Sequence, residues 1–168
     1  MPPKVAPGPV KNHWLVKTEP HVYSIDDLKR DRVTGWDGVR NYQARNFMRD
    51  GMKRGDLVLI YHSNADPPGV VGVGSVARES YPDPTAFDPN DPHFDAKSDP
   101  DNPRWLQVDI RYKKKLKRLV PLQELRSLKR LANMPLLQKG QRLSVQPVSR
   151  AEFNAVLEQS DKTKASPS

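Results

Sequence analysis

Two apolar, β-branched runs joined by a proline-rich turn constrain the fold of this chain more than any other feature. Residues 56–63 read DLVLIYHS, residues 69–76 read GVVGVGSV, and the segment 66–69 between them reads DPPG. Short apolar runs bounded by turn residues are typical of strands. The glycines at 72 and 74 indicate a bulge or a close approach of backbone. The sequence therefore predicts two strands connected by a turn.

The rest of the chain alternates strand and helix signals. Residues 105–113 alternate apolar and polar side chains, which predicts a half-buried strand. Ser24 with Asp27, Asn41, and Ser149 with Glu152 resemble helix N-terminal caps. Further strands are expected at 13–18 and 141–146, helices after Ser24, at 42–50, at 121–131 and after Ser149, and irregular loops at 34–41 and 80–103. We expect an α+β, barrel-like domain with helices packed around it.

The 168 residues fit one domain. Residues 12–160 form the expected domain, and the polar or proline-rich segments 1–11 and 161–168 are expected to be disordered tails. The chain has no cysteine, which excludes disulfides, thiolate metal sites and cysteine nucleophiles. It also has neither a signal-peptide pattern nor the run of roughly 18 apolar residues that a membrane helix needs. We therefore expect an intracellular protein, cytoplasmic or nuclear, with no membrane partner and with a monomer favoured.

Charge is distributed unevenly along the chain. The formal net charge is +8, and residues 111–142 contain eleven basic residues but only one acid, Glu124. Residues 80–103 contain six aspartates and one lysine. A basic surface attracts phosphates and releases their counterions. The pattern predicts a nucleic-acid partner and, within the cationic stretch, a phosphate track that includes Lys113, Lys114 and Lys115.

No motif for metal or catalytic chemistry is present. The four histidines lack a metal-binding helical spacing, and the aspartate-rich loop around His93 matches no EF-hand. His62 and Ser63 are adjacent on a predicted strand, so their side chains point to opposite faces and do not pair as base and nucleophile. We predict no cofactor, no metal and no enzymatic activity.

Aromatic residues lie close in sequence to cations. Trp36 occupies a polar, glycine-flanked loop, which favours a role in a site. Trp14 and Tyr61 lie on apolar strands, where packing in the core and stacking of a base are both open. Aromatic faces stack bases, and Lys or Arg side chains bind phosphates.

Several long motifs, in order, carry a resemblance to a known family. The sequence WLVKTEP at 14–20, WDGVRNYQARN at 36–46 and the run from Gly55 through YHSN at 61–64 resemble the successive signatures of EVE-domain proteins. Further matches follow at 81–85, 103–105 and 143–147, so the resemblance covers roughly residues 12–160. It implies a PUA-like β-barrel of about five to six strands with helices packed around it, a fold shared with YTH and ASCH domains.

The resemblance also implies a function. EVE domains are thought to bind modified bases, such as methylated or oxidised cytosines in DNA, or modified RNA. Recognition of a base edge requires the nucleotide to leave the stack and enter a pocket. The predicted base pocket consists of Trp14, Ser24, Trp36, Asn41, Tyr61, His62 and Ser63, and the predicted phosphate-binding residues are Lys17, Arg40, Arg45, Lys113, Lys114 and Lys115. Two alternatives stay open, an enzyme on the same fold (a nuclease or nucleotide hydrolase) and a sensor of a free modified nucleoside.

Overall fold

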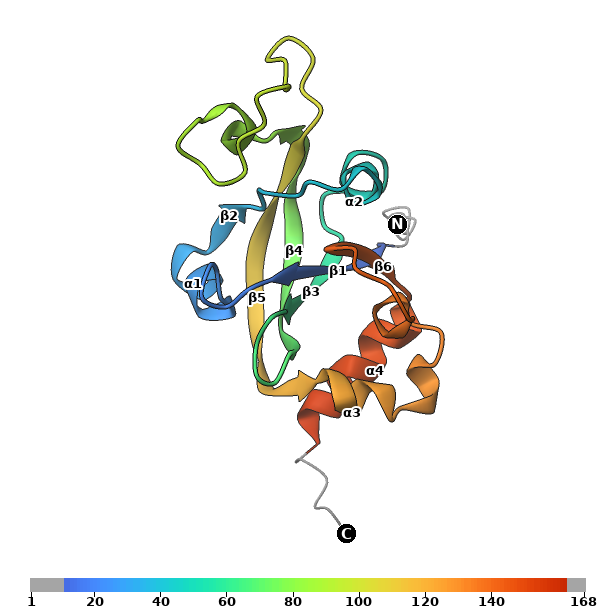
Figure 1. The fold of residues 1–168 in the computed structure, drawn as a ribbon. Helices are drawn as coiled ribbons and strands as arrows, with labels where there is room; N and C mark the ends of the chain where they lie inside the picture. The colour runs from blue at the N-terminus through green and yellow to red at the C-terminus, as the bar shows by residue number, and fades with distance from the viewer. Residues whose placement is uncertain (1–10, 163–168) are drawn as a thin grey trace, which may run out of the picture.

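A computed structural model describes residues 11–162 of the chain (Figure 1). Six strands form one mixed sheet in the order β2-β5-β4-β3-β1-β6, which confirms the α+β class and the expected strand number. The predicted tails lie outside the described residues, except for Lys11, Asp161 and Lys162. The elements are β1 His13–Thr18, α1 Ile25–Asp31, β2 Val33–Gly35, α2 Tyr42–Asn46, the π-helical turn Phe47–Gly51, β3 Leu57–His62, β4 Gly69–Pro82, the 3₁₀ turn Pro84–Phe87, β5 Leu106–Pro121, α3 Leu122–Arg126, the 3₁₀ turns Lys129–Leu131 and Pro135–Leu137, β6 Val145–Val148 and α4 Arg150–Asp161.

The two apolar runs form the hairpin β3–β4 in the middle of the sheet. β3 pairs antiparallel with β4 and parallel with β1. The register of β4 against β5 shifts between Val70 and Gly72, which confirms the predicted irregularity. A Cβ atom at Gly72 would collide with the side chain of Ile25 in α1 and would lie 3.0 Å from the backbone carbonyl oxygen of Lys114. Glycine at this position therefore lets α1 pack directly on the strand.

Several element boundaries differ from the sequence predictions. β4 and β5 run beyond 76 and 113, to Pro82 and Pro121, because their backbones keep pairing where the side chains become polar. β2 lies in the expected loop 34–41, since it pairs with β5, which is distant in sequence. The expected helices at 42–50 and 121–131 are shorter, and each gives way to a π-helical or 3₁₀ turn. The last strand is Val145–Val148 rather than 141–146.

Side chains alternate between two apolar clusters, one on each face of the sheet. On β1, Trp14 and Val16 join the first cluster, and Leu15 joins the second. The first cluster is completed by α1 and by the segment 36–52. The second contains residues of α3 and α4, which lie together at one end of the sheet, while residues 83–105 extend from the other end (Figure 1). The alternation follows from the two-residue period of a strand.

Candidate nucleic-acid interface

A cavity of about 770 Å³ opens on the side of the first cluster. Its walls come from the end of β1 and the loop that follows, from β2 and the next loop, and from three further places in the chain, namely Ser63, residues 91–93 and residues 141–144. The lining residues are Lys17, Thr18, Glu19, Val22, Tyr23, Thr34, Gly35, Trp36, Asp37, Gly38, Val39, Ser63, Asp91, Pro92, His93, Gln141, Arg142 and Ser144. Cavities of this size hold small ligands in many proteins.

Two aromatic side chains form part of the wall. Trp36 and Tyr23 meet edge to face, with ring centroids 6.1 Å apart and planes at 89°. Trp36 is only 7% exposed, and it belongs to the first apolar cluster as well as to the cavity wall. The polar loop does not keep Trp36 out of the core, because the loop folds back on the sheet and the backbone N–H of Trp36 donates to the carbonyl of Val108. Burial and a hydrogen bond to Asp31 raise the pKa of Tyr23 to about 12, so its hydroxyl stays protonated at neutral pH.

Lys17 and Arg142 add positive charge to the cavity. Lys17 is half-buried, and this burial lowers the pKa of its ammonium group. Its Nζ lies 5.9 Å from the ring centroid of Tyr61. Arg142 is exposed. Within residues 11–162, neither side chain forms an ion pair with a carboxylate. Both are therefore available to an anionic ligand.

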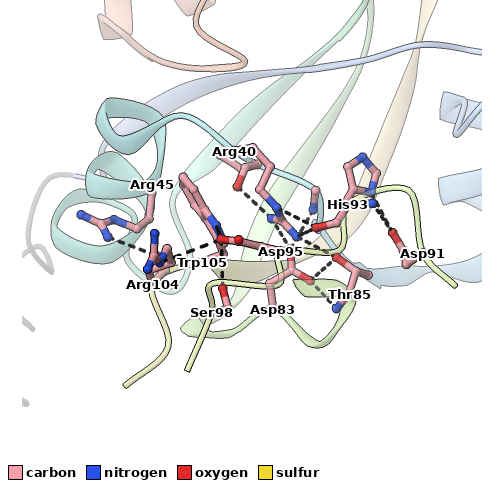
Figure 2. Close-up of polar contacts among 12 residues, drawn as sticks. Arg40, Arg45, Asp83, Thr85, Asp91, His93, Asp95, Ser98, Arg104 and Trp105 are labelled. Atoms are coloured by element: carbon pink, nitrogen blue, oxygen red, sulfur yellow. Dashed lines mark hydrogen bonds and ion pairs between the residues drawn. The ribbon is translucent and has the colours of Figure 1, made fainter. Parts of the chain in front are cut away.

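Arg40, predicted to bind phosphate, is instead fully used inside the protein (Figure 2). Its five N–H donors make five hydrogen bonds, of which the shortest joins Nη2 to the carbonyl oxygen of His93 at 2.7 Å. Nη1 pairs with the fully buried carboxylate of Asp83 at 2.9 Å. A guanidinium has only five donors. The structure therefore speaks against the phosphate role predicted for Arg40, because its donors already have partners within the protein. The sequence did not indicate this, since Asp83 lies far from Arg40 along the chain.

Arg45 lies outside the cavity. Its guanidinium donates to Asn46 Oδ1 and to the carbonyl of Arg104, and it covers the ring of Tyr42 at 4.9 Å. On β5, Lys113, Lys114 and Lys115 are exposed, Lys115 pairs with Asp26 at 2.9 Å, and none of the three lines the cavity. The phosphate-binding roles of Arg45 and of Lys113, Lys114 and Lys115 stay predictions.

Most of the residues predicted for the base pocket have structural roles away from the cavity. Ser24 and Asn41 accept backbone hydrogen bonds as the N-caps of α1 and α2. Trp14 is buried, and its Nε1 donates to Asp56 at 2.9 Å. Tyr61 belongs to the second apolar cluster.

His62 is buried as well, and its Nε2 accepts a hydrogen bond of 3.1 Å from the backbone N–H of Ile25, which ties α1 to β3. Of the seven predicted pocket residues, the cavity includes only Trp36 and Ser63. The other five side chains do not line the cavity, because they are buried along strands or act as helix caps.

The comparisons with known proteins agree with these features. The family model of the EVE domain matches residues 12–159. The chain belongs to the EVE domain family. Thymocyte nuclear protein 1 from Homo sapiens is 43% identical to this EVE chain over 172 residues, which cover 91% of this chain and 76% of that protein.

Solved structures share the fold of this EVE domain. A hypothetical protein from Leishmania major has a TM-score of 0.87 and 43% identity, with 90% of this chain and 96% of that chain covered. The human THYN1 protein, in a complex with DNA that contains 5-methylcytosine, has a TM-score of 0.85 and 43% identity, with 92% and 100% covered. The resemblance predicted from the motifs and the α+β fold are confirmed.

Sequence reasoning missed several cavity residues of this EVE domain. Tyr23 lies three residues after Pro20 in a loop that the sequence analysis did not assign to the site. The sequence around His93 was informative only about metal binding, because aspartates surround it. Arg142 stood at the end of the cationic stretch, where charge alone did not separate it from the other basic residues. Asp37 also lines the cavity, and burial together with the nearby Asp83 raises the pKa of its carboxyl group. These residues come from separate segments of the chain, and they meet at the cavity only after the chain has folded.

No group of three or more His, Asp or Glu side chains in residues 11–162 could hold a metal ion. Over the same residues, no helix is long and apolar enough to cross a bilayer.

Proposed function

We propose that this chain binds DNA that carries a modified cytosine and holds the modified base, turned out of the helix, in the cavity beside Trp36. The observation that carries the proposal is the cavity itself, which is lined by two aromatic side chains and by two cations that have no carboxylate partner among residues 11–162. Aromatic side chains stack extruded bases, and lysine or arginine neutralises the adjoining phosphates. The human relative that was crystallised with DNA containing 5-methylcytosine supports the same class of ligand.

A base leaves the DNA stack at a cost of a few kcal/mol, which an apolar side chain can offset by filling the gap. Val22 lines the cavity and is 66% exposed. Its loop is held in place, because the carbonyl of Glu19 accepts the N–H groups of Val22 and Tyr23, and Thr18 Oγ1 donates to the carbonyl of Tyr23. We assign Val22 as the side chain that takes the place of the extruded base.

We propose that the chain binds without turning over its ligand, because the cavity pairs no nucleophile with a base. The nuclease and hydrolase alternatives predict cleavage of an oligonucleotide in the presence of magnesium. The sensor alternative predicts that free 5-methylcytidine competes as well as DNA. An intracellular location stays a prediction, and the name of the human relative favours the nucleus.

The test compares duplex and single-stranded oligonucleotides that differ only by 5-methylcytosine, cytosine or thymine at one position, with matched RNA strands. Fluorescence anisotropy measures affinity, and 2-aminopurine opposite the test position reports extrusion of the base. We expect the methylated duplex to bind most tightly and to raise the 2-aminopurine signal.

Val22→Ser sharpens the same experiment. It should weaken binding to the duplex and leave binding to the single strand unchanged, since a single strand has no gap to fill. Equal affinity for all duplexes, with no fluorescence change, would refute the proposed function.

A further inference from the structure

Residues 83–104 fold into an arm that is locked against the cavity wall. Trp105, directly before β5, donates from Nε1 to Asp95 Oδ2 at 2.7 Å. At the other end, the backbone N–H of Gly38 and the guanidinium of Arg40 both donate to Asp83 Oδ2 at 2.9 Å. Figure 2 shows Arg40 between Asp83, Thr85 and the backbone of His93. The arm and the loop 36–40 are thus one interlocked unit.

His93 is one of the residues of this unit that line the cavity. Its ring rests on Gly38, where an added Cβ would lie 2.8 Å from both Cε1 and Nε2. Gly38 also has a φ of +79°, which side-chain-bearing residues rarely adopt. Arg40 holds the carbonyl of His93 from two of its nitrogens, at 2.7 and 3.0 Å. The ring therefore has little freedom to move.

Asp91 decides which ring nitrogen of His93 can accept a hydrogen bond. Asp91 Oδ1 lies 3.1 Å from His93 Nδ1 and also accepts the backbone N–H of His93 at 2.8 Å. A carboxylate only accepts hydrogen bonds, so Nδ1 carries the proton in the neutral ring. Nε2, which lies beside Gly38, then keeps a lone pair that accepts no hydrogen bond from residues 11–162.

We propose that His93 determines which base the cavity accepts, by offering Nε2 to an exocyclic amino group, and that Arg40 is a positioning residue for His93. The inference rests on the proposed function, and it names the contact that distinguishes one base from another. Cytosine and its 5-methyl form carry an amino group at C4, where thymine carries a carbonyl oxygen. 5-Methylcytosine and thymine share the methyl group, so an acceptor at this position separates two bases that a methyl-sized pocket alone does not.

The experiment measures two affinity ratios on the full chain, 5-methylcytosine over thymine and 5-methylcytosine over cytosine, with single-stranded probes so that duplex opening does not contribute. His93→Phe keeps a flat ring on Gly38 but removes the acceptor. We expect it to lower the first ratio about tenfold, because one good contact to a base edge provides discrimination of about this size. The second ratio and the melting temperature should stay unchanged. His93→Gln, which regains an acceptor, should restore part of the first ratio.

Arg40→Lys keeps the positive charge but lacks the forked donors, so it should also lower the first ratio. Combined with His93→Phe, it should add no further loss, because both changes act through one contact. Arg118→Lys is the matched control and should leave the first ratio unchanged, since this arginine also donates to a carboxylate and to backbone carbonyls but lies outside the cavity.

If folded His93→Phe keeps the full preference for 5-methylcytosine over thymine, the inference about His93 is wrong while the proposed function stands. If the wild-type protein itself binds all three bases equally, the proposed function fails, and the inference fails with it.

Discussion

Two regions of the molecule treat their charged residues in opposite ways. Around α3 and α4, Arg118 pairs with Glu124 at 2.7 Å and also donates to backbone carbonyls of residues 159 and 162. Where β1 ends at the cavity, Lys17 is half-buried and forms no ion pair with a carboxylate within residues 11–162, although burial disfavours its charge. Binding of an anion would offset the free-energy cost of that buried charge. The first region pairs its charges internally, which contributes to stability, and under the proposed function the second leaves its charge to bind a ligand.

The largest expected effect concerns the region around α3 and α4, where charged residues are paired within the protein. Phe153 of α4 is 3% exposed in the second cluster, so Phe153→Ala should lower the free energy of unfolding by about 3–5 kcal/mol. The preference for a modified base, measured below the melting temperature, should not change. Chemical denaturation and anisotropy on the same preparation check both statements. If the folded variant lost its preference for a modified base, the region around α3 and α4 would be coupled to the cavity.

Trp36 tests the point at which core and cavity meet. Trp36→Ala should weaken binding of the preferred base by about 1–3 kcal/mol through lost stacking. It should also lower stability, because Trp36 is buried on its core side. Trp36→Phe separates the two effects, since it keeps a stacking surface in a smaller volume. Normal discrimination by folded Trp36→Ala would rule out stacking on this side chain.

A variant of Lys17 tests whether the charged side chains at the cavity bind phosphate. Lys17→Met should reduce the slope of log affinity against log salt by about 1 and weaken binding to all sequences equally. Arg118→Met is the contrasting variant, which should change stability but not the slope. A slope that responds only to the triple change of Lys113, Lys114 and Lys115 to glutamate would move the phosphate track from the cavity to β5.

The smallest expected effect concerns acid sensitivity. Burial lowers the pKa of His62 and of His13 below the unfolded value of 6.5. The unfolded chain therefore binds protons first as the pH falls, so stability that is present above about pH 6.5 is lost below it, until the folded pKa values are reached. His62→Gln should reduce this loss, as seen in melting temperatures from pH 7.5 to 5. An unchanged pH profile would show that His62 does not titrate differently on unfolding.

The sequence by itself determined the local structure and the family. The alternation at 13–18 and 57–62 assigns each side chain to a face, because neighbouring residues on a strand point in opposite directions. The caps Ser24, Asn41 and Ser149 could be predicted for a similar reason, since each accepts an N–H only three residues away. These are short-range interactions, and a pattern of a few residues contains them completely.

Only the tertiary structure decided which side chains form the site. Arg40 and Lys17 look alike in sequence, yet the carboxylate that neutralises Arg40 belongs to Asp83, 43 residues further along, whereas no such partner reaches Lys17 among residues 11–162. The cavity likewise joins Trp36 to His93 and Arg142, and the register of β2 on β5 and the locked arm bring them together. Ion pairing, burial and cavity shape depend on distances between remote segments, and those distances exist only once the chain has folded.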